Sequence, residues 1–343
     1  MLGDRDRQIT RFLQSAGWAD ATRRPLAGDA SARRYERLSE GPGGRSCVFM
    51  DAPPARCPTT AAFVNIAGFL RIHGFSAPEI LGADIPRGLL LLEDLGDDLF
   101  ARMAHADPTA EPGLYDAATD FLIALHAIAP PHGLAVLDNA ELSRMIGVTY
   151  EWYLPGPDAG RKSAAMQAMQ TALDGLAPHR PVVALRDFHA ENLIWLANRT
   201  GLARVGLLDF QDAFLGHPAY DLISLTRDAR RDVSEEIAQR ATARYVTATG
   251  CDRGALEHAS AVLAAQRNLR ILGVFARLAR RDGKPDYLPL IPRVWAYLQR
   301  DLAHPGLEEL RMILARDLPV PDSSFLQNLR DMRAGWPKTR LPR

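Results

Sequence analysis

The sequence has very little lysine. Only three lysines, Lys162, Lys284 and Lys338, occur among 41 basic residues, so arginine carries nearly all of the positive charge. Acidic residues also total 41, and this balance gives no support to a nucleic-acid or membrane-surface binder, which carries a basic surplus. Long apolar runs are missing as well. No stretch approaches the roughly 20 apolar residues of a membrane span, and the N-terminus lacks the apolar segment of a secretory signal.

Cysteine is equally scarce. Cys47, Cys57 and Cys251 are scattered without the spacing of metal ligands, so we expect free thiols in a reducing cytoplasm. What the sequence does have is the composition of a globular protein, with 47% hydrophobic and 24% charged residues. Its 343 residues suffice for one large or two moderate hydrophobic cores.

The richest stretch of the sequence contains two apolar, strand-like runs, Leu193–Leu196 and Val205–Leu208. They flank a turn that carries Asn198 and Gly201, which is the pattern of a β-hairpin. Since a hairpin brings its outer ends together, side chains just outside the two strands are expected to meet.

Four polar residues lie at those outer ends. Asp187 and Asn192 precede the first strand, and Asp209 and Asp212 follow the second. All four side chains can therefore face one small volume that is rich in oxygen. Such a set suits Mg²⁺, which prefers carboxylates, waters and substrate phosphates to nitrogen or sulfur ligands.

The spacing of these residues is informative. Asp187 and Asn192 form D-x-x-x-x-N, the pattern of the catalytic loop in phosphotransferases of the protein-kinase type. Asp209-Phe210 stands where their metal-binding Asp-Phe-Gly would stand. Turn and cap roles would account for the first pattern alone. The hairpin, the second aspartate and a later Tyr-Asp-Leu at 220–222 together favour a kinase-type site.

Seven sequence strings extend this pattern along most of the chain in a fixed order. They are PLAGDASARRY at 25–35, VFMDAPP at 48–54, LLLLEDLGD at 89–97, RDFHAENL at 186–193, LDFQDA at 208–213, YDLISL at 220–225 and QRNLRILGVFARL at 266–278. On these strings the chain resembles the aminoglycoside phosphotransferase and choline kinase-like family. Within it, the resemblance is strongest to the cell-wall sugar kinases that act on the anomeric hydroxyl of N-acetylmuramate and N-acetylglucosamine.

The resemblance implies an α+β, bilobal, protein-kinase-like fold. It predicts a small β-rich N-lobe over 1–95, a larger helical C-lobe over 96–330 and an extended tail over 331–343. Residue patterns predict helices over 5–16, 60–73, 115–128, 234–247 and 254–280, and strands over 33–38, 46–50, 80–83 and 88–92.

The implied activity is ATP-dependent phosphorylation of the C1 hydroxyl of N-acetylmuramate, N-acetylglucosamine or both, in peptidoglycan recycling toward UDP-N-acetylmuramate. Mg²⁺ is the implied cofactor. The expected protein is a cytoplasmic monomer whose partners are ATP and a small amino sugar, with no nucleic acid and no membrane. Two alternatives remain open. One is an aminoglycoside or amino-alcohol kinase of the same fold, and the other is a nucleotide-binding pseudokinase.

The resemblance also implies roles for the polar residues of the hairpin. Asp187 would be the base that accepts the hydroxyl proton, and Asn192 and Asp209 would hold Mg²⁺ on the phosphates. Asp212 could aid the metal, bind the sugar or serve only as a turn residue.

The sequence departs from the family pattern in three places. Because no lysine precedes Lys162, the strand lysine that normally clamps the α- and β-phosphates is missing, and Met50 or Asp51 stands near its place. Leu185 replaces the histidine that usually precedes Arg-Asp in the catalytic loop. The loop that should cover the phosphates has one glycine, Gly28, instead of three.

That loop still offers candidate nucleotide-binding groups. Backbone N–H groups around Gly28 and the hydroxyl of Ser31 could cover phosphate, and Arg33 or Arg34 could supply the charge that lysine normally provides. Both arginines could instead be solvated strand residues. Since side chains alternate along a strand, at most one of the two should face the nucleotide.

The segment Glu93-Asp94-Leu95 follows a predicted strand and corresponds to the hinge of the resembled kinases. There, backbone groups meet the adenine base. We therefore predict a nucleotide-binding role for the chain from Glu93 to Leu95.

An acceptor site is predicted among the C-lobe helices. Glu151 and Trp152 offer a carboxylate and an aromatic face for a pyranose ring, although Trp152 could equally anchor the core. Arg267 and Arg270 are three residues apart on one helix and could meet the lactyl carboxylate of N-acetylmuramate. They could also pair with structural acids.

Overall fold

The computed structural model describes residues 3–26, 32–154, 156 and 159–332. The chain forms two compact units. The first is Met1–Phe121 with Leu185–Ala213, and the second is Leu122–Ala184 with Phe214–Arg343. An antiparallel sheet near the N-terminus is followed by a mostly helical region, so the predicted α+β kinase-like class is confirmed. The hairpin segment, which lies within 96–330, belongs to the first unit.

The sheet of the first unit has five antiparallel strands in the order β1-β2-β3-β5-β4. The strands are β1 Thr22–Pro25, β2 Arg34–Ser39, β3 Cys47–Asp51, β4 Ile80–Asp84 and β5 Leu89–Glu93. Four of them were predicted to within one residue at each end. The edge strand β1 was not predicted separately, because its four residues are all exposed and show no alternation.

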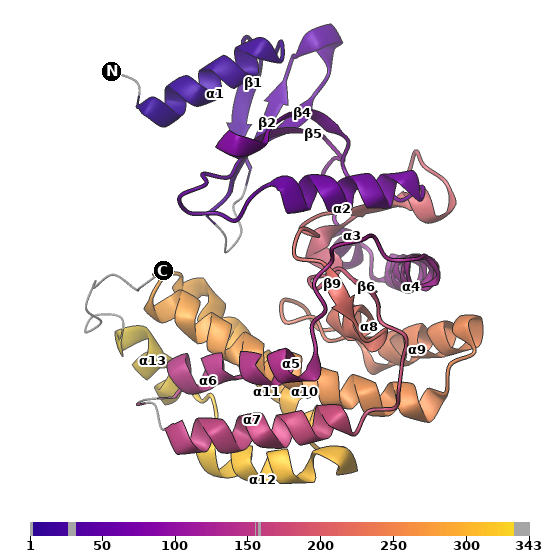
Figure 1. The fold of residues 1–343 in the computed structure, drawn as a ribbon, viewed down its shortest axis with the longest axis vertical. Helices are drawn as coiled ribbons and strands as arrows, with labels where there is room; N and C mark the ends of the chain where they lie inside the picture. The colour runs from indigo at the N-terminus through magenta and orange to yellow at the C-terminus, as the bar shows by residue number, and fades with distance from the viewer. Residues whose placement is uncertain (1–2, 27–31, 155, 157–158, 333–343) are drawn as a thin grey trace. The chain divides into compact units, whose positions relative to one another are not determined.

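Helix α1, Asp4–Ser15, covers one face of this sheet (Figure 1). Its apolar residues Ile9 and Leu13 pack with Leu38 of β2 and Phe49 of β3 in one buried cluster. Since alternate residues of a strand share a face, Asp51, two positions beyond Phe49, must lie on the α1 side as well.

Helix α2, Ala61–Ile72, lies on the other side of the sheet from α1 in the same view (Figure 1). Phe63, Ile66, Phe69 and Leu70 form its buried stripe, as the spacing predicted. Helix α3, Phe100–Ala106, follows β5, and α4, Glu111–Ala127, leads from the first unit into the second.

The predicted hairpin is confirmed. Strands β7, Leu193–Trp195, and β8, Val205–Leu207, pair antiparallel, and Leu193 stands opposite Leu207. The hairpin is fixed to the first unit through Ser76, whose carbonyl accepts from the Leu207 N–H at 3.0 Å. The Ser76 hydroxyl also donates to the Ala203 carbonyl at 2.6 Å.

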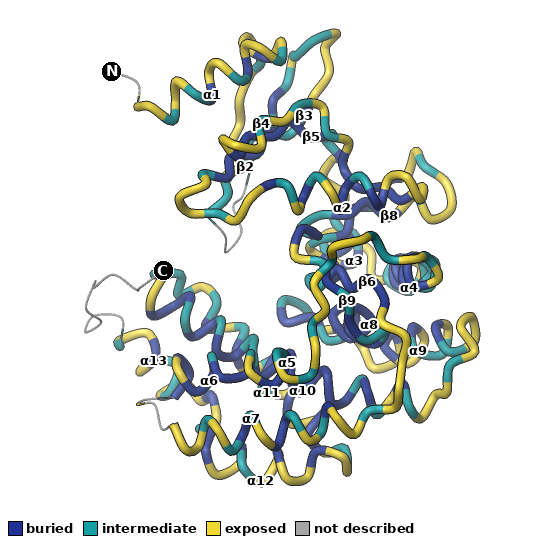
Figure 2. The backbone as a smooth tube through the Cα atoms, in the orientation of Figure 1, coloured by how far each residue is buried: buried dark blue, intermediate teal, exposed yellow. Residues whose placement is uncertain are grey.

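The second unit is largely helical. Its elements are α5 Asn139–Met145, α6 Gly147–Trp152, α7 Ala159–Asp174, β6 Val182–Ala184, β9 Phe214–Gly216, α8 Ala219–Thr226, α9 Glu235–Thr249, α10 Arg253–Arg280, α11 Ile291–Asp301, α12 Glu308–Asp317 and α13 Ser323–Asp331. Figure 2 shows α10 as a mainly buried helix, and its predicted inward residues, Leu263, Leu269, Leu272 and Phe275, are buried.

Helices α6 and α10 approach very closely at Gly273. A Cβ atom at this position would lie 2.5 Å from the backbone nitrogen of Thr149, so only glycine fits. The Thr149 hydroxyl donates to the Leu269 carbonyl next to this crossing. The close approach of α6 and α10 therefore requires a residue without a side chain at position 273.

Two expectations concern the C-terminal tail and the absence of a membrane-spanning segment. Most of the predicted tail, residues 333–343, lies outside the described residues. In the described part of the chain, none of the helices combines the length and the apolar character that crossing a bilayer requires.

Candidate active site

The predicted catalytic loop begins directly after β6. Leu185 is buried in the place of the usual histidine, and the half-buried Asp187 donates its backbone N–H to the Leu185 carbonyl at 3.0 Å. Between them, Arg186 has a φ of +77°, in the left-handed region that side chains disfavour. Such a conformation persists where the surrounding structure fixes it, often at a functional site.

Asn192 connects the two ends of the hairpin. Its side-chain Nδ2 donates to the carbonyl of Asp187 at 2.8 Å, and its own carbonyl accepts from the Leu208 N–H at 2.9 Å. Asp209 follows Leu208 directly. The hairpin thus brings the backbone at Asp187 and at Leu208, which precedes Asp209, into contact with Asn192.

Asp209 also has left-handed backbone geometry, with a φ of +54°. Its Oδ1 accepts from Gln211 Nε2 at 2.7 Å and lies 3.6 Å from Nη1 of Arg33. Gln211 also lies 3.5 Å from the exposed Asp212. Sequence reasoning missed Gln211, because a glutamine between two acids has no distinctive pattern of its own.

Each of the two key aspartates is followed by a buried phenylalanine. Phe188 stacks on Phe121 of α4 with ring centroids 5.4 Å apart, and Phe210 stacks on Phe63 of α2 at 4.7 Å. Both rings are almost fully buried. The aromatic anchors hold the backbone next to Asp187 and Asp209 while the carboxylates stay half-buried.

The residues predicted to bind the phosphates are only partly described. Gly28 and Ser31 lie outside the described residues. Arg33 forms its ion pair with Asp209, whereas Arg34 forms one with Asp51 of β3. The two neighbouring arginines therefore have different partners.

Arginines hold the side chains of the predicted hinge. Glu93 pairs with Arg199. Arg37 forms an ion pair with Asp94, with its Nε 2.8 Å from Oδ2, and its Nη2 donates to Asp94 Oδ1 at 2.9 Å. Arg37 also pairs with Asp97 at 2.6 Å, and this hydrogen bond lowers the pKa of Asp97.

The third hinge residue has apolar surroundings. Leu95 is buried with Ile194 and Leu196, and Leu99 and Leu208 pack against the same cluster. Since Ile194 lies on β7 and Leu208 follows β8, this apolar cluster connects the hinge to the hairpin.

The predicted acceptor residues of α6 lie in the second unit. Glu151 accepts from Lys162 Nζ at 2.5 Å. Trp152 is 8% exposed, and the guanidinium carbon of Arg280 lies 5.7 Å from its ring centroid. Of the two roles that the sequence left open for Trp152, this geometry matches the core anchor.

The two predicted arginines of α10 have different environments. Arg267 is buried, donates to the Ser224 hydroxyl at 2.6 Å and has its guanidinium carbon 5.5 Å from the ring centroid of Tyr220. Arg270 is half-buried. Arg267 thus has partners inside the second unit. The two arginines were expected to lie on one helix face, where they could meet the lactyl carboxylate or pair with structural acids.

The predicted metal ligands supply few donors. Among the residues that the structure describes, no group of three or more His, Cys, Asp or Glu side chains could hold a metal ion. Asp209 and Asn192 offer one carboxylate and one amide. This donor set fits Mg²⁺, which commonly binds one or two protein ligands and completes its shell with water and substrate phosphates.

A five-stranded antiparallel sheet and a hairpin that gathers Asp187, Asn192 and Asp209 define a phosphotransferase with a protein-kinase-like fold. Sequence comparison agrees. Residues 22–256 match the model of the phosphotransferase enzyme family known as APH. The chain belongs to this family.

Similar curated proteins share one description. The chain is 42% identical to an N-acetylmuramate/N-acetylglucosamine kinase of Caulobacter vibrioides, over 93% of this chain and 98% of the relative. It is 34% identical to a protein of Pseudomonas aeruginosa with the same description, over 90% of this chain and 94% of the relative.

Solved structures with low sequence identity share the fold. An aminoglycoside 2'-phosphotransferase-IIIa in complex with GDP matches with a TM-score of 0.61 at 14% identity, covering 88% of this chain and 99% of that one. A choline/ethanolamine kinase family protein of Mesorhizobium loti matches with a TM-score of 0.59 at 16% identity, covering 91% and 99%. At these identities the likeness concerns the fold alone.

Proposed function

We propose that this protein is an ATP-dependent kinase that phosphorylates the C1 hydroxyl of N-acetylmuramate, N-acetylglucosamine or both. One observation carries the proposal: similarity to kinases described by these two acceptors extends over nine-tenths of the chain and includes the hairpin with Asp187, Asn192 and Asp209. The product would be a sugar 1-phosphate, an intermediate suited to peptidoglycan recycling toward UDP-N-acetylmuramate. We further propose that the enzyme is a cytoplasmic monomer.

Asp187 is proposed as the base. The acceptor oxygen forms a bond to the γ-phosphorus, the bond from that phosphorus to the β-phosphate oxygen breaks, and ADP leaves. The hydroxyl proton passes to the Asp187 carboxylate. Because an unperturbed hydroxyl is far less acidic than a carboxyl group, this transfer comes late, and most of the acceleration comes from positioning and charge stabilisation.

Asn192 and Asp209 are proposed to hold Mg²⁺. When bound, the ion would neutralise part of the charge on the phosphates. The left-handed backbone of Asp209 and the 2.7 Å hydrogen bond from Gln211 fix this carboxylate on the protein side. Asp212, which is exposed beside Gln211, is left available to the metal or the sugar.

The hinge from Glu93 to Leu95 is proposed to bind the base of the nucleotide. Its acidic side chains are already paired with Arg199 and Arg37, so backbone groups are the natural donors and acceptors for a purine. The buried Leu95 contributes apolar surface. Related folds have been solved with ATP, ADP and GDP, and we propose ATP as the donor here.

We propose that the acceptor sugar binds in the second unit at the predicted residues Glu151, Trp152, Arg267 and Arg270. Arg270 is half-buried, while Trp152 and Arg267 are buried and have partners within that unit. Arg270 is therefore the first of the four to substitute when acceptor binding is tested.

The proposal is tested with a phosphate-transfer assay that compares four acceptors: N-acetylmuramate, N-acetylglucosamine, kanamycin and choline. Methyl glycosides of the two amino sugars are the controls, because their C1 oxygen carries no proton to transfer. We expect ADP release with the free sugars only. Phosphorylation of kanamycin or choline alone would move the protein to the first alternative, and nucleotide binding without any transfer would make it a pseudokinase.

A further inference from the structure

The missing strand lysine leaves a definite position on β3. Met50 and Asp51 are the two residues near that place, and they project to opposite faces of the sheet because side chains alternate along a strand. Asp51 contacts Arg5 of α1, so Asp51 lies on the α1 face. Met50 is fully buried on the other face and cannot bind a phosphate group.

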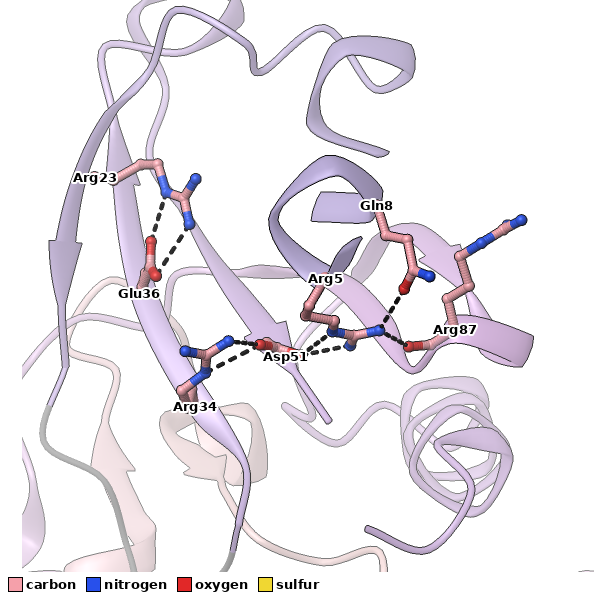
Figure 3. Close-up of polar contacts among 7 residues, drawn as sticks. All are labelled: Arg5, Gln8, Arg23, Arg34, Glu36, Asp51 and Arg87. Carbon is pink, nitrogen blue, oxygen red and sulfur yellow. Dashed lines mark hydrogen bonds and ion pairs between the residues drawn. The ribbon is translucent and has the colours of Figure 1, made fainter. Parts of the chain in front are cut away.

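The Asp51 carboxylate is buried, with 3% of its side chain exposed, and both of its oxygens are bonded to arginines (Figure 3). Oδ1 accepts from Arg5, with Nε at 3.0 Å and Nη2 at 2.5 Å. Oδ2 accepts from Arg34 Nε at 3.0 Å and from Arg34 Nη2. This double hydrogen bond raises the pKa of Arg34.

The register of the sheet fixes the direction of Arg34. Arg34 stands opposite Asp51 in the β2–β3 pairing, and the two side chains share the α1 face. Glu36 and Leu38 continue that face, since Leu38 packs in the α1 cluster. Arg34 is therefore committed to the α1 face, although 64% of its side chain is exposed.

Arg33 is directed to the opposite side of β2. It precedes β2, and its Nη1 lies 3.6 Å from Asp209 Oδ1, while only 10% of its side chain is exposed. Arg37 lies four residues further on and contacts the hinge residue Asp94 at 2.8 Å. Arg33 and Arg37 thus lie on the same side of β2. That side faces the predicted metal ligand Asp209 and the predicted hinge residue Asp94.

We infer that Arg33 is the phosphate-binding cation that replaces the strand lysine, and that Asp51 is a positioning residue that acts through Arg34. The inference rests on the proposed kinase function. Asp209 is the proposed ligand of the metal on the nucleotide phosphates, so a guanidinium beside Asp209 lies close to where those phosphates would bind. A guanidinium can donate to two phosphate oxygens at once. By holding Arg34 on the α1 face, Asp51 keeps the preceding residue directed to Asp209.

The test measures the Kd of ADP by calorimetry in EDTA, where no metal contributes, and compares five variants with the wild type. Arg33→Met should raise the Kd about tenfold, and Arg33→Lys, which keeps a charge, less than threefold. Asp51→Asn and Arg34→Met should each raise it about threefold. In the double variant R33M/D51N the Kd should not exceed that of R33M, because both changes act through one side chain.

Arg5→Met is the matched control. It removes the α1 half of the same network, while Arg34 and Asp51 remain paired. We expect a lower Tm and an unchanged Kd. The KM of ATP should follow the Kd across the series, and the kcat of R5M should stay within twofold of the wild-type value.

Three outcomes would overturn the inference. An unchanged Kd in R33M removes Arg33 from phosphate binding. A lower Tm with unchanged Kd in both D51N and R34M makes the network purely structural, and R34M decides if D51N does not fold. An additive double variant contradicts action through Arg33. Failure of the proposed sugar kinase function is separate, since ADP binding would follow the predicted pattern while no amino sugar is phosphorylated.

Discussion

The predicted catalytic site of the first unit and helices α10 and α11 of the second unit use polar and charged residues in contrasting ways. In the first unit, the carboxylates of Asp187 and Asp209 are half-buried. In the second, Arg267, Asn268 and Asp301 are buried and have partners inside the unit. Arg267 donates to Ser224, and Asn268 donates to Asp301 at 3.1 Å. A half-buried charge can reach a ligand, whereas a buried and bonded one is released only when the structure opens. The first unit should therefore govern turnover, and the second should govern stability.

Backbone strain follows the same division. Among the described residues, positive φ outside glycine occurs at Glu40, Arg186 and Asp209, all in the first unit. Each such residue costs on the order of 1–3 kcal/mol. Two of the three lie next to, or at, a predicted catalytic or metal-binding side chain.

The largest expected effect is on turnover and belongs to the first unit. Asp187→Asn keeps the shape of the side chain but cannot accept a proton, so kcat should fall about 10²-fold or more. Mg·ATP affinity and Tm should stay near the wild-type values. Steady-state kinetics with a thermal melt checks both, and a variant that keeps half of the wild-type turnover would remove Asp187 from catalysis.

The second effect concerns nucleotide binding in the first unit. With ATP present, adding Mg²⁺ should raise the Tm of the wild-type protein, and Asp209→Ala should abolish this magnesium-dependent increase. In the wild type, ligand at 100 times its Kd contributes about 2.7 kcal/mol, which is measurable as a melting shift. Exposed Asp212→Ala is the comparison variant. An equal magnesium-dependent shift in wild type and D209A would place the metal elsewhere.

The third effect should appear in the second unit and leave turnover alone. Gly273→Ala places a Cβ 2.5 Å from the Thr149 backbone, so overpacking should cost about 1–3 kcal/mol. Gly254→Ala, at the start of the same helix, meets only Asp252 Oδ1 at 3.4 Å and should be neutral or stabilising. Chemical denaturation measures both, with kcat per folded molecule as the cross-check. Equal stabilities would show that α6 and α10 can separate without cost.

The fourth effect is a pH dependence of the second unit. Burial lowers the pKa of His126 to about 4 and that of His217 to about 3. An unfolded histidine has a pKa near 6.5, so on acidification the unfolded chain takes up protons first. Below about pH 6.5 each histidine therefore removes up to about 1.4 kcal/mol of stability per pH unit.

Asp301 acts in the opposite direction. Burial raises its pKa to about 6, so between about pH 6 and 4 the folded state takes up its proton first and gains stability. The wild-type Tm should fall from pH 7 to pH 5, less steeply in His126→Gln and more steeply in Asp301→Asn. Identical slopes in the three proteins would mean that these groups do not titrate as burial implies.

Sequence patterns predicted the long elements well. Helix α10 was expected over 254–280 and spans Arg253–Arg280, and the hairpin was expected from its two apolar runs. The paired strands Val182–Ala184 and Phe214–Gly216 were not predicted. Three residues are too few to show alternation, and their pairing depends on segments that are thirty residues apart.

The site was predicted in part, for physical reasons. The order of Asp187, Asn192 and Asp209 follows from the loop and the hairpin, which are local. The choice between Arg33 and Arg34 depends on the register of β2 with β3, which alternation alone cannot give. The burial of Arg267 could not be foreseen, because helical spacing tells which residues share a face but not what covers that face.

The most direct test of the proposed function is ³¹P nuclear magnetic resonance of the product formed from N-acetylmuramate and ATP, with wild-type protein and D187N at equal concentration. The wild type should give one sugar phosphate whose phosphorus couples to the anomeric proton, and D187N should give almost none in the same time. A phosphate on another hydroxyl, or equal product from both proteins, would contradict the proposal.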